Sequence, residues 1–427
     1  MGALKRRLNR TDALAIALGA VIGVGVFRNT GLVLRGTGGF AAATALWLVV
    51  GALCLGGAVL YSDLCSRVPE VGGQYAYVRV AFGGHAAFVY GWMNAGVVIP
   101  ARQAAIVAVA GEVMSRWIPV SPRALAIALL LVLAVLHLSG VRAGVIAQRV
   151  FTAGKLATIA LVVGLSLMLG WHGSTGPVSV EPASFAAAVG AVWYTYLGWQ
   201  DVVILAEEVH NPRRDLPFVM FGTVGLTMVL YVVLHVAVYL ALGGGAEAFG
   251  ALPALDVARR ALGHAGETLL TGLMLASMIG IAALAVLLRP RMAMALARDG
   301  LGPKLLTRVS RVGTPDVALG LHVGIALVLV STGSYVKLLE LISFASGIMG
   351  LVEIASYFVV RRKRPELPTS RFHPWGPLAF LVMSGALCVL GAMDHPMGVL
   401  TSFGVVAAIA IVYALTRPKL LAPVTRG

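Results

Sequence analysis

The chain has 427 residues, of which 59% are hydrophobic and 12% are charged, and its mean hydropathy is +0.90. A soluble protein of this size cannot bury so much apolar surface, so lipid must be part of its solvent. The formal net charge of +15 could suggest a nucleic-acid-binding protein, but the basic residues lie in short segments between apolar runs, so we expect no nucleic-acid partner. The three cysteines are scattered and lack metal-ligand spacing, which indicates small apolar residues.

A helix that crosses a bilayer needs about 20 largely apolar residues. Twelve runs in the chain meet this need, and they predict an all-α membrane protein with about 12 transmembrane helices. The connections are short, so we expect one polytopic membrane domain over residues 1–427, without a cleavable signal peptide. The twelve runs lie at residues 11–34, 42–66, 84–114, 121–139, 147–170, 184–206, 217–242, 266–297, 316–332, 335–361, 376–393 and 397–416.

The distribution of basic residues predicts how these spans are oriented. The amino-terminal segment carries Lys5, Arg6, Arg7 and Arg10, and the segments on its side hold most of the 33 lysines and arginines when the spans alternate. Basic residues are enriched in cytoplasmic segments of membrane proteins. We therefore expect a multi-pass protein of the cell (inner or plasma) membrane, with both termini in the cytoplasm.

The first span is weakened in its own middle by glycines. Gly19 and Gly23 alone would fit a packing face of small residues, which is common in membrane helices. Gly25 adds a third glycine within seven residues, and each glycine costs a helix about 1 kcal/mol relative to alanine. Packing and a break in the helix are thus both open interpretations of this span taken by itself.

The sixth span has a similarly irregular centre, because Tyr194, Thr195, Tyr196 and Gly198 are followed by the polar pair Gln200 and Asp201. The first and sixth spans are five helices apart, so they begin on opposite sides of the membrane. Paired interrupted helices at corresponding positions of inverted halves indicate a transport site at the membrane midplane. We predict a first five-helix repeat at 11–170, an inverted second repeat at 184–361, and two additional helices at 376–416.

Four motifs resemble the amino acid–polyamine–organocation (APC) superfamily. They are GAVIGVGVF at 19–27, YTYLGWQ with AEEVHNPRRDLP at 194–217, RMAMALARDGLGPKLL with GTPDVALGLH at 291–322, and VIPARQAAIVA at 98–108. The last of these is similar to the L-type amino-acid transporters (LAT-like). The resemblance implies the LeuT-like 5+5 inverted repeat with broken helices 1 and 6. Tyr194, Thr195 and Arg28 depart from the usual Phe, Ala and apolar residue of the motifs.

The expected substrate site is built from backbone at the two breaks. Freed N–H groups at the start of a half-helix suit a carboxylate, and freed carbonyls suit an ammonium group, so a zwitterion needs no charged side chain. The resemblance implies that Tyr194 is an aromatic lid. Ser277 is the one deep hydroxyl of the eighth span. The predicted substrate-binding residues are Ile22, Gly23, Val24, Gly25, Tyr194, Thr195, Tyr196 and Ser277.

Lys155, within the fifth span, is the predicted coupling residue. A lysine at this depth could snorkel to the inner interface. The resemblance implies instead that it projects toward the first break, where sodium-coupled relatives hold their ion. There it would exchange a proton, or stay protonated and tie the fifth span to the unwound backbone. We expect no sodium site, no other metal and no cofactor.

Three other charged groups have two open interpretations each. Glu207 and Glu208 lie near Arg213 and Arg214, and they could form either a cytoplasmic gate or an interfacial salt bridge. Arg102 lies within a span, where it would line the pocket or reach a carbonyl.

These observations predict a secondary active transporter that carries neutral L-amino acids by alternating access. Exchange and proton-coupled symport are both open, so the expected partners are a free amino acid, the lipid bilayer and, for symport, a proton. Whether an accessory subunit takes part is left open by the sequence. The alternatives are a polyamine or cationic amino-acid transporter of the same fold, a membrane-embedded enzyme, and a channel. The nine histidines are dispersed without catalytic grouping, and no filter motif repeats, so we expect a protein that is not an enzyme.

Overall fold

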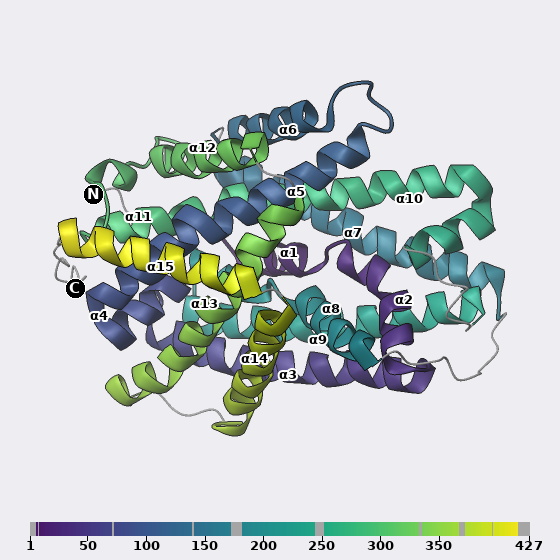
Figure 1. The fold of residues 1–427 in the computed structure, drawn as a ribbon, viewed down its shortest axis with the longest axis horizontal. Coiled ribbons are helices and arrows are strands. Elements are labelled where there is room, and N and C mark those ends of the chain that lie inside the picture. Colours follow the sequence, from purple (N-terminus) through teal and green to yellow (C-terminus); the bar gives the residue numbers. More distant parts are fainter. Residues whose placement is uncertain are drawn as a thin grey trace.

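The structure is a computed structural model, and its described part is helical throughout (Figure 1). An isolated bridge between Leu8 and Val209 is the one β-type pairing within that part. The predicted all-α fold class is confirmed. The described residues are 6, 8–70, 72–138, 141–171, 182–243, 252–332, 335–366, 372–394 and 396–416.

Each predicted apolar run contains a helix. Six helical stretches of the described part are long and apolar enough to cross a membrane, or seven if the bent pair α1–α2 counts as one span. The helices are α1 (Arg10–Val21), α2 (Gly25–Thr37), α3 (Phe40–Arg67), α4 (Gln74–Met93), the π-helical turn η1 (Asn94–Val98), α5 (Ile99–Met114), α6 (Pro122–Leu138), α7 (Val141–Leu169), α8 (Pro182–Tyr196), the 3₁₀ helix η2 (Trp199–Leu205), α9 (Pro212–Leu242), α10 (Pro253–Leu288), α11 (Pro290–Arg298), the 3₁₀ helix η4 (Lys304–Thr307), α12 (Asp316–Thr332), α13 (Tyr335–Lys363), α14 (Trp375–Asp394) and α15 (Pro396–Thr416).

The first predicted span is broken in its middle, as its glycines suggested. Asn9 caps α1 in a reciprocal capping box with Asp12, and the helix ends at Val21. Ile22 is extended, and α2 begins at Gly25 with its axis bent by 45° from α1. The break therefore falls between Val21 and Gly25, inside the GAVIGVGVF motif.

The sixth span is also broken, at Gly198 within the predicted irregular centre. Tyr194 to Tyr196, the first residues of that centre, are still helical and form the end of α8. The chain turns at Gly198, whose φ of 123° is a conformation that L side chains rarely adopt. It then continues as the 3₁₀ helix η2. Glycine, rather than the aromatic residues before it, decides where this helix ends.

Two helices begin earlier than their apolar runs. α4 starts at Gln74 instead of residue 84, and α10 starts at Pro253 instead of residue 266. Each extra piece joins its apolar part through a kink at a glycine, Gly83 with φ 83° and Gly263 with φ 62°. Hydropathy marks only the more apolar part, because the added pieces carry charged residues such as Arg79 and Asp256.

The amino-terminal segment packs on the chain that leads into α9. Leu8 donates its N–H to the Glu208 carbonyl at 2.9 Å and accepts the His210 N–H at 3.0 Å. Arg10 forms an ion pair with Asp215 at 2.8 Å. Of the four basic residues predicted to orient this end, Lys5 and Arg7 lie outside the described residues. The contacts tie the start of the first broken helix to the segment that follows the second.

Candidate binding site at two helix breaks

The two breaks lie directly against each other. A Cβ atom added at Gly198 would lie 2.6 Å from the Ala20 carbonyl oxygen, so glycine is required there for space as well as for its φ. The hydroxyl of Tyr231, buried on α9, lies 3.1 Å from the Val21 carbonyl and 3.4 Å from the Thr195 carbonyl. One tyrosine thus reaches the last turns of both interrupted helices, where carbonyls lack intrahelical donors.

A cavity of about 300 Å³ opens at this junction, and we call it the break cavity. Backbone of both breaks reaches it. The N–H groups of Gly23, Val24 and Gly25, and the carbonyl of Ala20, have no hydrogen-bond partner in the described part of the chain. The residues that line it are Ala20, Val21, Gly23, Val24, Gly25, Ile99, Arg102, Gln103, Ala105, Ile106, Val109, Tyr194, Thr195, Leu197, Gly198, Gln200, Met278, Ile281, Ala285 and Arg289.

The predicted residues divide into two groups. Gly23, Val24, Gly25, Tyr194 and Thr195 line the break cavity together, although the two sets are about 170 positions apart in the sequence. Side chains also join the half-helices directly, since Asn29 of α2 donates to the Thr195 hydroxyl at 2.8 Å and to the Ala191 carbonyl at 3.2 Å.

Three predicted residues are outside the lining of this cavity. Ile22 is fully buried. The Tyr196 side chain points away from the break, and its hydroxyl donates to the Trp47 carbonyl at 3.1 Å. Ser277 is buried, and its hydroxyl has no partner in the described residues. On α10 Met278 and Ile281 line the cavity instead.

Lys155 projects toward the first break. Its side chain is buried at 1% exposure, and its Nζ donates to the Gly19 carbonyl at 2.5 Å. Gly19 O would accept the Gly23 N–H if α1 continued, so the lysine replaces a backbone donor that the break removes. A Cβ at Gly19 would lie 1.8 Å from Gln148 and 2.5 Å from Thr152, both on α7. Gly19 is thus a close packing position for α7, and the packing interpretation holds for this glycine.

Charged side chains mark the side of the break cavity that faces α5 and α10. Arg102 lines it, and its Nε has no partner among the described residues. Arg289 also lines it and pairs with Asp201 of η2. Gln200 accepts the Gly198 N–H at 3.0 Å, which steadies the second break. Among the residues that the structure describes, the lining therefore carries the cation Arg102 without an acidic partner, and Arg289 in a closed ion pair with Asp201.

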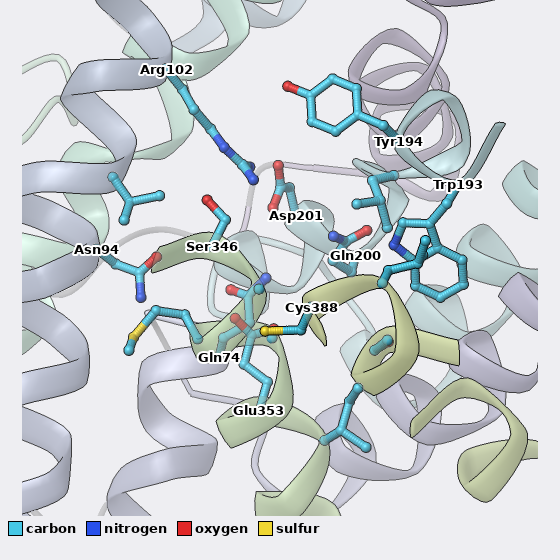
Figure 2. Close-up of a pocket in the computed structure, with 18 of the residues that line it drawn as sticks. Gln74, Asn94, Arg102, Trp193, Tyr194, Gln200, Asp201, Ser346, Glu353 and Cys388 are labelled. Atoms are coloured by element: carbon cyan, nitrogen blue, oxygen red, sulfur yellow. The ribbon is translucent and has the colours of Figure 1, made fainter. Parts of the chain in front are cut away.

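A second cavity of about 550 Å³ adjoins the first, and we call it the Glu353 cavity. The two share Arg102, Tyr194 and Arg289 in their lining. Figure 2 shows Arg102, Asp201 and Glu353 around one space. Glu353 of α13 accepts hydrogen bonds from the hydroxyls of Tyr61 and Tyr90. Our sequence reasoning missed Glu353, although an acid within the apolar run GIMGLVEIASYFVV is an unusual feature that marks function.

Ion pairs gather where the segment after η2 meets α11. Glu208 pairs with Arg291, with side chains 3% and 1% exposed, and Glu207 pairs with Arg298 at 3.1 Å. The expected neighbours Arg213 and Arg214 are therefore not the partners of these acids, since α11 brings in closer arginines. Beyond Arg298, Asp299 contacts Arg79 and accepts a hydrogen bond from Tyr75, and burial raises the pKa of its carboxyl despite the opposing effect of Arg79.

Comparison with known proteins finds amino acid permeases and transporters that match nearly the whole chain. Residues 8–415 match the family described as Amino acid permease. The chain is 26% identical to the serine/threonine exchanger SteT of Bacillus subtilis over 400 residues, which cover 91% of each protein. It is 27% identical to the human Asc-type amino acid transporter 1 over 92% of this chain and 79% of that protein. For the human large neutral amino acids transporter small subunit 2 the identity is 26%, over 92% of this chain and 77% of the relative.

Proposed function

The chain belongs to the amino acid permease family, and on that premise we propose that it carries neutral L-amino acids across the cell membrane by alternating access. The names of its relatives, a serine/threonine exchanger and a transporter of large neutral amino acids, support this class of substrate. A permease role also fits our expectation that the protein is not an enzyme.

The observation that carries the proposal is the backbone at the breaks. The free N–H groups of Gly23, Val24 and Gly25 stand at the positive end of the α2 dipole, which suits the carboxylate of an amino acid. The free carbonyl of Ala20 lies on the same cavity and suits its ammonium group. Main-chain groups of this kind recognise the part that all α-amino acids share.

The rest of the break cavity suits a neutral side chain. Ile106, Met278 and Ile281 provide apolar wall for the substrate's side chain. Arg102 adds a positive charge that no described acid pairs with. A second cation in the same cavity would be repelled. Neutral amino acids are therefore favoured over the alternative substrates, polyamines and cationic amino acids.

Exchange is our proposed basal mode, with Lys155 as a fixed cation. Its hydrogen bond to the Gly19 carbonyl holds the broken end of α1 against α7. A lysine in this structural role can keep its charge throughout the cycle, as exchange requires. We propose that the twelve helical segments span the membrane, with both termini cytoplasmic. Residues 11–170 and 184–361 would form the two inverted repeats, followed by the helices at 376–416. The corresponding breaks after Val21 and Tyr196 support this arrangement.

Counterflow in liposomes tests the proposal. The purified chain is reconstituted, the vesicles are loaded with unlabelled serine, alanine or leucine, and uptake of the radiolabelled amino acid is followed. We expect uptake well above that of vesicles without internal amino acid, and competition by neutral amino acids but not by lysine or putrescine. Equal uptake by loaded and empty vesicles would exclude exchange, and strong competition by lysine or putrescine would favour the cationic alternative.

A further inference from the structure

Glu353 places a carboxyl group in the larger cavity that the amino acid site does not use. Both of its oxygens accept tyrosine hydroxyls, one from Tyr61 of α3 and one from Tyr90 of α4. No ion pair joins it to a lysine, arginine or histidine in the described residues. Hydroxyl groups are neutral, so they solvate a carboxylate without cancelling its charge.

The other titratable groups around Glu353 leave that charge uncompensated. Asp201 of η2 and Arg289 at the end of α10 are close enough to act on it, but they are already paired with each other. Tyr77 of α4 also senses its charge. The remaining titratable groups that line the cavity are Arg102 of α5, Tyr194 of α8 and Cys388 of α14 (Figure 2).

The balance between the ionised and the neutral form depends on both tyrosines. Burial in a low-dielectric site disfavours the carboxylate, and two hydrogen bonds to the charged form oppose this effect. Loss of one tyrosine bond would therefore tip the group toward the protonated form. The two hydroxyl donors come from different helices, so a relative movement of α3 and α4 is enough to break one bond.

The helix packing would let such a movement accompany the transport cycle. α3 packs along α9 and contacts both α8, which holds one of the breaks, and α13, which carries Glu353. α4 packs more extensively along α13. When the broken helices rearrange to open the amino acid site, α3 is positioned to move with them. Tyr61 would then leave the Glu353 carboxylate while Tyr90 stays.

We propose that Glu353 is a proton-binding site that couples amino acid transport to proton movement. This inference rests on the proposed transport function. When Tyr61 withdraws, the Glu353 oxygen that it vacates takes a proton from hydronium in the cavity. When Tyr61 returns, the O–H bond of the carboxyl group breaks and the proton leaves to water on the other side. A proton adds directly to a carboxylate oxygen, whereas an organic cation would also have to lie beside Arg102, which lines the same cavity.

The test uses the full chain in liposomes and the variant Glu353→Gln, which keeps the shape of the side chain but cannot ionise. At one proton per amino acid, a gradient of about one pH unit sustains up to about tenfold accumulation of alanine in otherwise empty vesicles. We expect the unmodified chain to accumulate alanine under this gradient. Glu353→Gln should lose the accumulation but keep counterflow within about twofold. Glu112→Gln, at an exposed glutamate of α5, should behave as the unmodified chain.

The variant Tyr61→Phe tests the role of the tyrosine bond through the pH dependence of uptake, which would not change if Tyr61 only stabilised the fold. Because it removes one donor to the carboxylate, the site should hold its proton about tenfold more tightly. The pH of half-maximal gradient-driven uptake should therefore shift upward by about one unit. Tyr196→Phe, whose hydroxyl donates to a backbone carbonyl elsewhere, is the control for loss of a buried hydroxyl.

Each other outcome overturns the inference in a recognisable way. If Glu353→Gln still accumulates alanine, or if the unmodified chain never does, Glu353 is not a coupling site for protons. Counterflow would in either case still support the proposed exchange. Loss of counterflow as well in Glu353→Gln would make Glu353 part of the amino acid machinery. Relief of lysine or putrescine inhibition in that variant would identify an organic-cation site. Absence of counterflow in the unmodified chain would instead refute the proposed function itself.

Discussion

Gly198 lies with its α-carbon against the carbonyl of Ala20, so that the turn of one broken helix fits against the end of the other. A Cβ at Gly198 would come within 2.6 Å of Ala20 O and 2.9 Å of its carbonyl carbon. The contact joins segments 178 positions apart (198 − 20), and it brings the free backbone groups of the first break to the same cavity as Thr195 and Gly198.

Gly198→Ala should abolish transport. The added methyl group meets backbone, which cannot rotate away, and alanine is strained at a φ of 123°. We expect a loss of about 2–4 kcal/mol of stability or an opened junction between the breaks. Thermal unfolding in detergent and counterflow measure the two effects. Gly225→Ala on α9, where a Cβ meets nothing within 4 Å, is the matched control and should stay near normal.

Gly25→Ala should weaken substrate affinity by about tenfold, because its Cβ would lie 2.9 Å from the Thr195 hydroxyl and push the free N–H groups away from the cavity. The concentration of alanine that half-saturates counterflow measures this effect. Adding Thr195→Ala makes space for the methyl group, so the double variant should recover much of the affinity. If it binds no better than Gly25→Ala, steric pressure from Thr195 is not the cause.

Lys155→Ala should lower counterflow by about tenfold or more. The variant leaves the buried Gly19 carbonyl without a donor, which costs about 1–3 kcal/mol and loosens α1 at the break. Initial rates of serine counterflow at several pH values provide the measurement, with the exposed Lys304→Ala as control. If the variant keeps its counterflow but loses gradient-driven accumulation, Lys155 rather than Glu353 is the coupling residue.

Glu208→Gln should be strongly destabilising, by about 3–5 kcal/mol, because it leaves the buried guanidinium of Arg291 without its carboxylate. Thermal unfolding measures this loss. The double variant with Arg291→Leu should unfold at a higher temperature than Glu208→Gln alone, because it no longer buries an unpaired charge.

The exposed pair Arg259–Glu267 is the matched comparison for Glu208. Its side chains are 60% and 28% exposed, and water already solvates both charges. Glu267→Gln should therefore leave the unfolding temperature unchanged. A similar effect of the two glutamine variants would mean that burial does not decide the strength of the Glu208 pair.

Local features of the sequence were enough to predict the helices and the first break. Apolar runs mark helices because each span depends on its own residues for hydrogen bonding and for contact with lipid. Gly23 and Gly25 mark the break for the same local reason, since glycine weakens whatever helix contains it. The predicted second break included Gly198, where the helix turns, but it also took in Tyr194 and Tyr196, which are helical. Aromatic residues suit a helix end and a helix interior equally well, so the sequence did not fix where α8 ends.

Which side chains meet was decided by the tertiary structure. The facing of Ser277, the approach of Tyr231 to both breaks, and the contact between Tyr61 and Glu353 each depend on how helices rotate and pack. Tyr61 and Glu353 are 292 positions apart, and no local pattern encodes their distance. The sequence by itself determined a membrane-embedded helical chain with a glycine-rich break and a family resemblance. Only packing between distant helices decided which backbone groups stay free and which acid lies in a cavity, because those properties belong to pairs of segments and not to one.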